Sequence, residues 1–242
     1  MSAPPFTPVL RQDWRDLLFL HWSADPEILR RRLPDALELD TFDGTAYLGL
    51  TPFRLENARP AGVPALPGLG ALGTFGEVNL RTYVRPRAEP TSRGGGEPGV
   101  WFFSLDAASL PAVLGARAAY RLPYFDADIE VERTGSRVRF ASRRRGRPGH
   151  CRVVWHAGGD PTPSVPESLE EFLVERYVLY TASGGALWRA RVAHEPYPVA
   201  AARVESLDQD LVEQAGLAVA GEPLVHWSPG VDPAVSAPER LG

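Results

Sequence analysis

Residues Glu77–Arg85 read EVNLRTYVR and show the alternation of a β-strand with two unlike faces. The small or apolar side chains share one face, and they are Val78, Leu80, Thr82 and Val84. The polar or amphipathic side chains share the other face, and they are Glu77, Asn79, Arg81 and Tyr83. The pattern therefore predicts a strand whose two faces meet different surroundings.

The polar face of this strand has two interpretations. If it points to solvent, its residues are ordinary decoration of an edge. If it points into a barrel, Arg81 needs a partner, because an unpaired buried guanidinium is very costly. Glu77, Asp106 or the carboxylate of a ligand are the candidate partners, and an Arg beside an aromatic-lined cavity suits a carboxylate.

The segments upstream of this strand also favour a β-protein. Residues 14–22 (WRDLLFLHW) form an apolar run that predicts a buried strand. Asp25 and Pro26 have the order of a helix N-cap followed by the first helical residue, so a short helix is expected. Residues 37–41 and 45–55 flank Asp43-Gly44, a dipeptide that predicts a β-hairpin.

The segments downstream continue this pattern. Residues 124–133 and 136–145 flank Thr134-Gly135 and predict a second hairpin, and the capping box at Ser168–Glu171 opens a helix. The Pro- and Gly-rich residues 57–76 and 87–99 are expected to be flexible loops. The remaining expected strands are 100–105, 151–156, 186–194 and 223–228, and the remaining helices are 107–120 and 207–215. About nine strands and three or four short helices indicate one mainly β (α+β) domain over residues 1–242, an antiparallel barrel or sandwich.

The composition excludes several kinds of chemistry. All 26 basic residues of the 242 are Arg, so no lysine is available for a side-chain imine or a P-loop. A single cysteine, Cys151, forbids an intrachain disulfide and fits a cytoplasmic location. No apolar run approaches a membrane span, so no membrane partner is expected. The net charge of -4 argues against a nucleic-acid partner.

Common site motifs are also missing from the sequence. The five histidines have no metal-binding spacing, and neither a nucleophile elbow nor a dinucleotide or Walker fingerprint occurs. We therefore expect no metal and no cofactor. The basic run at residues 143–147 (RRRGR) is interpreted as a solvated hairpin end, with a phosphate or nucleic-acid grip as the less favoured alternative. The sequence does not decide between a monomer and a homo-oligomer.

Two further polar spots lie elsewhere in the sequence. His21 and Trp22 end the apolar run at residues 14–22, and a histidine is able to act as a general acid or base near neutral pH. The alternative is a hydrogen-bonded core histidine, which is the more common case. The other spot, Glu175-Arg176-Tyr177, follows the capped helix.

Eight motifs follow one another along nearly the whole chain, and they are LLFLHW (17–22), LELDTFDG (37–44), LTPFRL (50–55), VNLRTYV (78–84), FFSLDA (102–107), LPYFDA (122–127), SRRR (142–145) and LVERYVLYT (173–181). In this order and spacing they resemble the YqjF-like family of uncharacterised bacterial proteins. That family is similar to acetoacetate decarboxylase. The resemblance implies a closed antiparallel β-barrel of the acetoacetate decarboxylase-like type, with a few short peripheral helices and an internal, partly apolar pocket.

The resemblance does not carry the decarboxylase mechanism with it. The two adjacent lysines of acetoacetate decarboxylase would fall on Ala112 and Val113, so an imine mechanism is rejected. Its strand glutamate would fall near Glu77, and its substrate-binding arginine would fall near His21 or Trp22 and is not kept.

These observations lead to one hypothesis and one rival. We expect a small organic molecule, with an acid as the favoured kind, to bind in the barrel, and general acid–base chemistry is its only route to turnover. Glu77 and His21 are the candidate catalytic residues. The candidate ligand-binding residues are Arg81, Asn79, Tyr83, Trp22, Phe103, Asp106, Tyr124 and Arg176. The rival is a non-catalytic binding or scaffold protein with a packed barrel core, in which Glu77 and Arg81 pair with each other.

Overall fold

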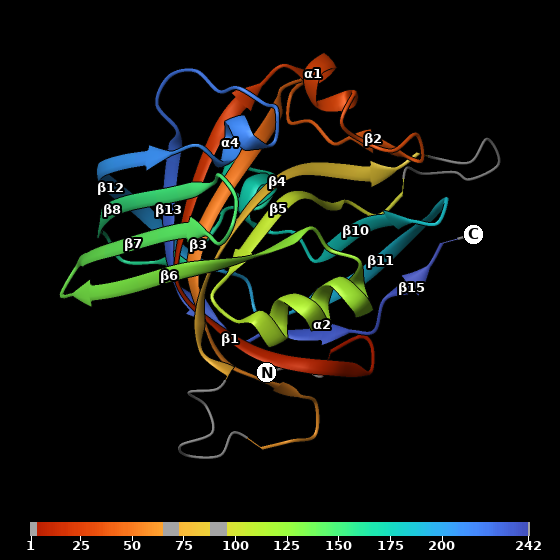
Figure 1. The fold of residues 1–242 in the computed structure, drawn as a ribbon. Coiled ribbons are helices and arrows are strands. Elements are labelled where there is room, and N and C mark those ends of the chain that lie inside the picture. Colours follow the sequence, from red (N-terminus) through yellow and green to blue (C-terminus); the bar gives the residue numbers. More distant parts are fainter. Residues whose placement is uncertain (1–3, 65–72, 88–95, 242) are drawn as a thin grey trace.

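The computed structural model describes residues 4–64, 73–87 and 96–241, and it is mainly β (Figure 1). The first strands are β1 (Pro8–Ala24), β2 (Leu37–Leu39), β3 (Ala46–Pro60), β4 (Phe75–Pro86), β5 (Gly99–Ala107), β6 (Tyr124–Thr134), β7 (Arg137–Arg144) and β8 (His150–Ala157). The later strands are β9 (Thr162–Pro163), β10 (Val178–Ser183), β11 (Ala186–Ala193), β12 (Pro198–Gln209), β13 (Leu224–Val231), β14 (Ala234–Ser236) and β15 (Glu239–Arg240). The helices are α1 (Pro26–Arg30), α2 (Leu110–Tyr120), α3 (Leu169–Val174) and α4 (Leu211–Gln214).

The strands pair side by side in two closed routes, and both routes include β1, β3, β4 and β5. One route runs from β5 through β6, β7, β8, β12 and β13 to β1, and the other runs from β5 through β10, β11 and β14 to β1. Within the described residues the pairings are antiparallel, except that β5 pairs in parallel with β6 and with β10. The expected antiparallel arrangement therefore needs this correction at β5.

The shared strands are buried on both faces. On β1, Leu18 and Leu20 pack into the core enclosed by the first route, together with Trp155 and Trp227. Their neighbour Phe19 packs on the opposite face, in a second core enclosed by the other route. Burial on both faces explains why residues 14–22 form an almost continuous apolar run.

Two bulges change which residues of the shared strands face the second core. Asp16 has a φ of 53° and is the extra residue of β1 opposite β3. Phe103 is the extra residue of β5 opposite β4, between the partners of Leu80 and Arg81. A bulge shifts the two-residue alternation by one, so the face of each strand reverses there.

Several predicted elements are confirmed. The hairpin of β6 and β7 turns at Gly135, where φ is 60°. Asp25 caps α1 by accepting a hydrogen bond from the Glu27 amide, and Ser168 caps α3 by accepting one from the Glu171 amide. The polar and apolar faces of β4 are both formed as the alternation predicted.

Other predictions are wrong. The expected hairpin of residues 37–41 and 45–55 forms only its turn, where Phe42 and Thr45 exchange hydrogen bonds. Both edges of β3 are occupied by β1 and β4. β2 instead pairs with residues 84–86 of β4, beyond Thr82 where the pairing with β3 ends, while β5 occupies the opposite edge of β4. The helix predicted over residues 207–215 is confined to α4, because residues up to Gln209 continue β12. The strands β10 and β12 were not predicted at all.

The two predicted loops are partly strands. Residues 57–60 belong to β3, and residues 75–76 belong to β4. Residues 65–72 and 88–95, the centres of the two predicted loops, lie outside the described residues. Among the helices that are described, none has the length and apolar character needed to cross a membrane.

Candidate functional site

An internal cavity of about 130 Å³ lies inside the second route of strands. Its wall comes from β1, β3, β4, β5, β10, β11 and β14 and from Tyr124 at the start of β6, and α2 covers one side (Figure 1). The wall is largely apolar and aromatic, and its polar or amphipathic members are Gln12, Trp14, Thr51, Glu77, Asn79, Arg81, Tyr120, Tyr124, Arg176 and Tyr197. Three residues of the polar face of β4, Glu77, Asn79 and Arg81, therefore line this cavity and do not face solvent.

Arg81 is a buried cation whose partners are neutral groups, among them the Phe19 ring, whose centre lies 5.7 Å from the guanidinium carbon. Its side chain belongs to a residue that is 8% exposed, and its Nη2 donates to the Leu173 carbonyl oxygen at 3.4 Å. Its Nε has no hydrogen-bond partner, and within the described residues no carboxylate lies at ion-pair distance from it. The expected pairing of Arg81 with Glu77 or Asp106 is thus absent there. A cation left in this state favours an anion in the cavity.

Glu77 and Tyr124 form the opposite polar end of the site. The Tyr124 hydroxyl donates to Glu77 Oε2 at 3.0 Å. Burial raises the pKa of Glu77 to about 8, and the charge of Asp106 adds to this, while the hydrogen bond from Tyr124 acts in the opposite direction. The carboxyl group is therefore mostly protonated at neutral pH, and it is able to donate a proton or a hydrogen bond to a ligand.

Two more buried polar atoms of the wall have no partner. These are Thr51 Oγ1 and Asn79 Oδ1, and the two residues face each other across the β3–β4 pair. Buried polar groups in folded proteins are nearly always satisfied by protein, water or ligand. Together with Arg81 Nε, they are polar groups of the wall that water or a ligand is able to satisfy.

Arg176 adds a second guanidinium to the wall. Its Nη2 donates to Asp40 Oδ2 at 3.2 Å, and Asp40 also pairs with Arg85. The guanidinium carbon of Arg176 lies 4.2 Å from the centre of the Phe172 ring. One carboxylate is therefore shared by two guanidiniums, and with a protonated Glu77 the site carries a positive charge.

His21 lies behind Arg81 and is not part of the cavity wall. The ring is fully buried and stacks near Phe19, and neither ring nitrogen has a hydrogen-bond partner. It faces Gly49 across the β1–β3 pair, where a Cβ would lie 3.1 Å from His21 Cδ2 and 3.4 Å from Arg81 Cγ. Burial, followed by the charge of Arg81, lowers the pKa of His21, so the ring is neutral at pH 7.

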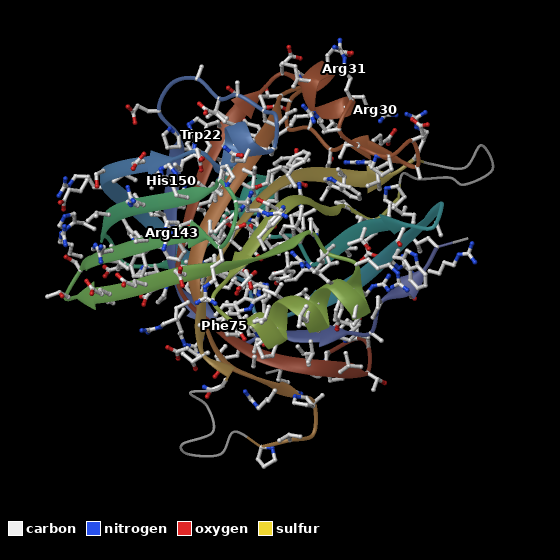
Figure 2. All side chains as sticks on the ribbon, viewed as in Figure 1. Trp22, Arg30, Arg31, Phe75, Arg143 and His150 are labelled. Atoms are coloured by element: carbon white, nitrogen blue, oxygen red, sulfur yellow. The ribbon has the colours of Figure 1, made fainter. Side chains whose placement is uncertain are left out.

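Four of the predicted ligand-binding residues lie outside the cavity wall. Trp22 lies near α4 (Figure 2), where its indole nitrogen donates to the Gly221 carbonyl oxygen at 3.2 Å. Phe103 packs against the first core, and Asp106 pairs with Arg144 on that same side. Tyr83 lies behind Arg81 and donates to the Leu173 carbonyl oxygen at 2.7 Å. Trp22, Phe103 and Asp106 lie outside the wall because the bulges at Asp16 and Phe103 reverse which face of β1 and β5 their side chains occupy.

The sequence did not predict the cavity-lining residues whose positions depend on strand register and on bulges. Trp14 and Leu17 both line the cavity because the Asp16 bulge lies between them, and Phe102 and Leu105 do so on either side of the Phe103 bulge. Thr51 lines it because it is the register partner of Asn79. No local pattern in the sequence announces these positions.

The remaining reactive groups offer little chemistry. Burial raises the pKa of the Cys151 thiol strongly, so this cysteine is an inert core residue. Across the described ranges, no group of three His, Cys, Asp or Glu side chains is arranged to hold a metal ion.

The raised pKa of Glu77 predicts an unusual pH dependence of stability. Between pH 4.5, the ordinary value, and about pH 8, the folded protein holds a proton that the unfolded chain has lost. The contribution of Glu77 to stability is therefore fully present below pH 4.5 and is lost as the pH rises toward 8, by up to about 1.4 kcal/mol per pH unit. Denaturant unfolding of wild type and Glu77→Gln from pH 5 to 8 measures this, since the variant keeps an acceptor for Tyr124. Parallel stability curves for the two proteins would contradict the protonated Glu77.

The arrangement of strands is that of a known fold class. The chain superimposes on acetoacetate decarboxylase from Legionella pneumophila with a TM-score of 0.66 at 14% identity, covering 100% of this chain and 92% of that one. It superimposes on the enduracididine biosynthesis enzyme MppR, complexed with the condensation product of pyruvate and imidazole 4-carboxaldehyde, with a TM-score of 0.67 at 13% identity, covering 100% and 92%. The protein therefore has an acetoacetate decarboxylase-like fold.

The family follows from sequence comparison. The model of the DUF2071 family, described as "Uncharacterized conserved protein (COG2071)", matches residues 11–232. The uncharacterized protein YqjF of Bacillus subtilis (strain 168) is 36% identical over 230 residues, which cover 94% of this chain and 90% of that protein. The chain belongs to this YqjF-like family, and the predicted family membership is confirmed.

Proposed function

We propose that this protein binds a small organic acid in its internal cavity, with Arg81 as the anchor for the carboxylate. The observation that carries the proposal is the buried Arg81 guanidinium, which faces a cavity and has no carboxylate partner within the described residues. Arg176 strengthens the positive charge, and the closed ring of strand pairings supports a barrel that shields it from water.

The size of the cavity limits the ligand. A cavity of about 130 Å³ is smaller than the usual ligand site of about 300–1,000 Å³. It is close to the engineered cavity of about 150 Å³ that accommodates benzene. We therefore propose an acid of a few carbon atoms, which agrees with the structure of the neighbour MppR in complex with pyruvate.

The polar groups of the wall have distinct proposed roles. Asn79 and Thr51 supply hydrogen bonds along the ligand, and Glu77 with Tyr124 supplies a neutral acid at the end away from Arg81. His21 and Arg81 both lie against Gly49, but His21 does not line the cavity. We therefore propose that His21 positions Arg81 and does not contact the ligand. The chain has no lysine for an imine, so the proposed route to turnover is proton transfer to or from a bound ligand.

The rival hypothesis, a scaffold with a packed core, is less well supported. It requires an ion pair between Glu77 and Arg81 and no cavity between them. Within the described residues the two side chains have no such pair, and both line the same cavity. A ligand in the cavity would satisfy the unpartnered polar atoms of its wall, which a packed core would leave unpaired.

A thermal-shift screen of short keto, hydroxy and aromatic acids tests the proposed function. We expect short acids to raise the melting temperature and their methyl esters or amides not to do so, because Arg81 needs a negative charge as its partner. Binding of a given acid should weaken above about pH 8, where Glu77 ionises and opposes a second negative charge. Failure of every acid to shift the transition, together with unchanged stability of Arg81→Ala, would exclude the cavity as a ligand site.

A further inference from the structure

A second, cationic hollow of about 360 Å³ opens at the surface between β7, β8 and the turn at residues 145–149. Its ionisable lining residues are Arg143, Arg144, Arg147, Arg152, His150 and Asp210. Four guanidiniums therefore face one carboxylate. The hollow is separate from the internal cavity, because Arg144 of β7 pairs with Asp106 of β5 and neither residue lines that cavity.

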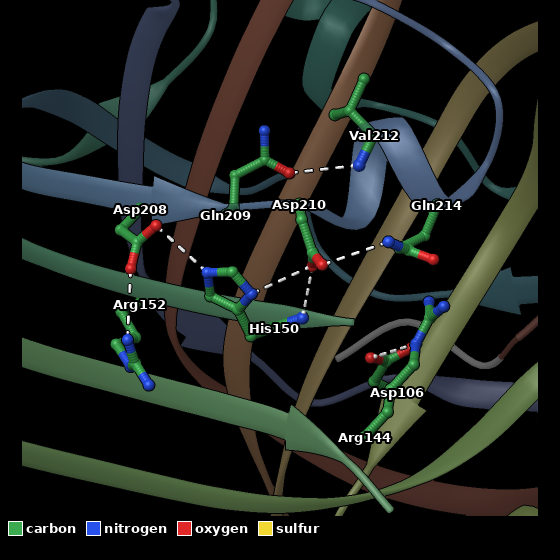
Figure 3. A network of polar contacts seen from close by, with 9 residues as sticks. All are labelled: Asp106, Arg144, His150, Arg152, Asp208, Gln209, Asp210, Val212 and Gln214. Carbon is green, nitrogen blue, oxygen red and sulfur yellow. Dashed lines mark hydrogen bonds and ion pairs between the residues drawn. The ribbon is translucent and has the colours of Figure 1, made fainter. Parts of the chain in front are cut away.

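Arg144 is the fixed member of this group. Its side chain is 5% exposed, and its Nε donates to both oxygens of Asp106, at 3.0 and 2.8 Å (Figure 3). Its buried Nη2 has no hydrogen-bond partner. The turn closes tightly over it at Gly149, where φ is 138° and a Cβ would lie 2.4 Å from Arg144 Cδ. A glycine is thus required for the turn to approach the arginine.

Two of the other three arginines, Arg143 and Arg152, are held by carboxylates that lie outside the hollow. Arg143 donates through Nη2 to Asp128 at 3.3 Å, and Arg152 donates through Nη1 to Asp208 at 3.2 Å (Figure 3). Each of these contacts uses one nitrogen of a guanidinium that carries five donor hydrogens. Arg147 lies with its guanidinium carbon 5.0 Å from the Phe125 ring centre, and no ion pair is found for it among the described residues.

We propose that this hollow binds the phosphate group of a small molecule. Guanidiniums match the oxygens of a phosphate in geometry and charge. A compact anion is favoured over a nucleic acid, because the surrounding carboxylates of Asp126, Asp128 and Asp208 repel an extended polyanion. The chain as a whole is also acidic, at -4.

The test is titration of the full-length protein with inorganic phosphate and with a simple phosphomonoester, by calorimetry at low salt. We expect saturable binding at one site. The double variant Arg143→Ala/Arg147→Ala, which leaves the buried Arg144 pair intact, should weaken it at least about tenfold by removing two charge-assisted contacts. The matched control is Arg139→Ala, which removes an exposed arginine of β7 that does not line the hollow, and its affinity should stay within about twofold.

Three outcomes would overturn the proposal. One is the absence of saturable phosphate binding by the wild type. Another is equal weakening by the control, which means that general surface charge and not the hollow attracts the anion. The third is tight, strongly salt-dependent binding of a short oligonucleotide without binding of the monoester, which assigns the surface to nucleic acid instead.

Discussion

Replacing Arg81 by Met should stabilise the unliganded protein and at the same time remove its affinity for small acids. The guanidinium is buried without a carboxylate partner in the described residues, so an apolar chain of similar length relieves a desolvation penalty of about 1–3 kcal/mol. For a protein of this size, that gain raises the melting temperature by roughly 2–12 °C. The lost charge-assisted hydrogen bonds should weaken acid binding by about 10- to 150-fold.

The two effects are measured on the same samples, by thermal unfolding without ligand and by titration with the best acid from the screen. Arg59→Met is the matched control, because Arg59 lies outside the cavity wall and pairs with Asp13 at 3.6 Å. It should leave acid binding unchanged and give no gain in stability. A strongly destabilised Arg81→Met that still binds acids would show that Arg81 is structural and that another group holds the carboxylate.

Removing the carboxylate of Asp106 should destabilise the protein far more than removing a carboxylate of any exposed ion pair. Asp106 is fully buried and accepts both hydrogen bonds of Arg144 Nε, so Asp106→Ala leaves an uncompensated guanidinium in the first core. The expected loss is about 3–5 kcal/mol. This corresponds to a fall in melting temperature of roughly 6–20 °C.

A second substitution separates this mechanism from a simple packing defect. Asp106→Ala/Arg144→Met removes both charges and should recover most of the loss, since an apolar pair needs no compensation. Asp128→Ala serves as the control, because its pairs with Arg143 and Arg145 are exposed to solvent and should contribute little to stability. If the double variant is no more stable than Asp106→Ala, the buried charge is not the source of the loss.

The local alternation of the sequence predicted the part of the site that lies on β4. Glu77, Asn79 and Arg81 share one face because a strand repeats every two residues, and the structure places that face in the cavity. The sequence could not show whether this face borders solvent or an internal cavity, because both surroundings are compatible with the same alternation of polar and apolar residues. Tyr124 of β6 and Arg176, which lies between α3 and β10, join the site through long-range contacts that no local signal specifies.

The errors have a common physical origin in strand pairing. Asp106 was expected beside Arg81, but the extra residue Phe103 turns it to the other core. The hairpin predicted at Asp43-Gly44 failed because β1 and β4 take both edges of β3. Local turn propensity determined the turn at Asp43-Gly44. The strands that pair with β3 were determined by competition for its edges, which involves residues far apart in the sequence.

The bulge at Asp16 constrains how the length of this chain is able to vary in evolution. Deleting one residue between Trp14 and Leu17 would shift the alternation of the N-terminal half of β1 by one residue, so its side chains would exchange faces. Trp14 would then leave the cavity, and its neighbours on β1 would enter it. Relatives that keep the cavity should therefore tolerate a change of side chain at position 16 more readily than a change in the number of residues there.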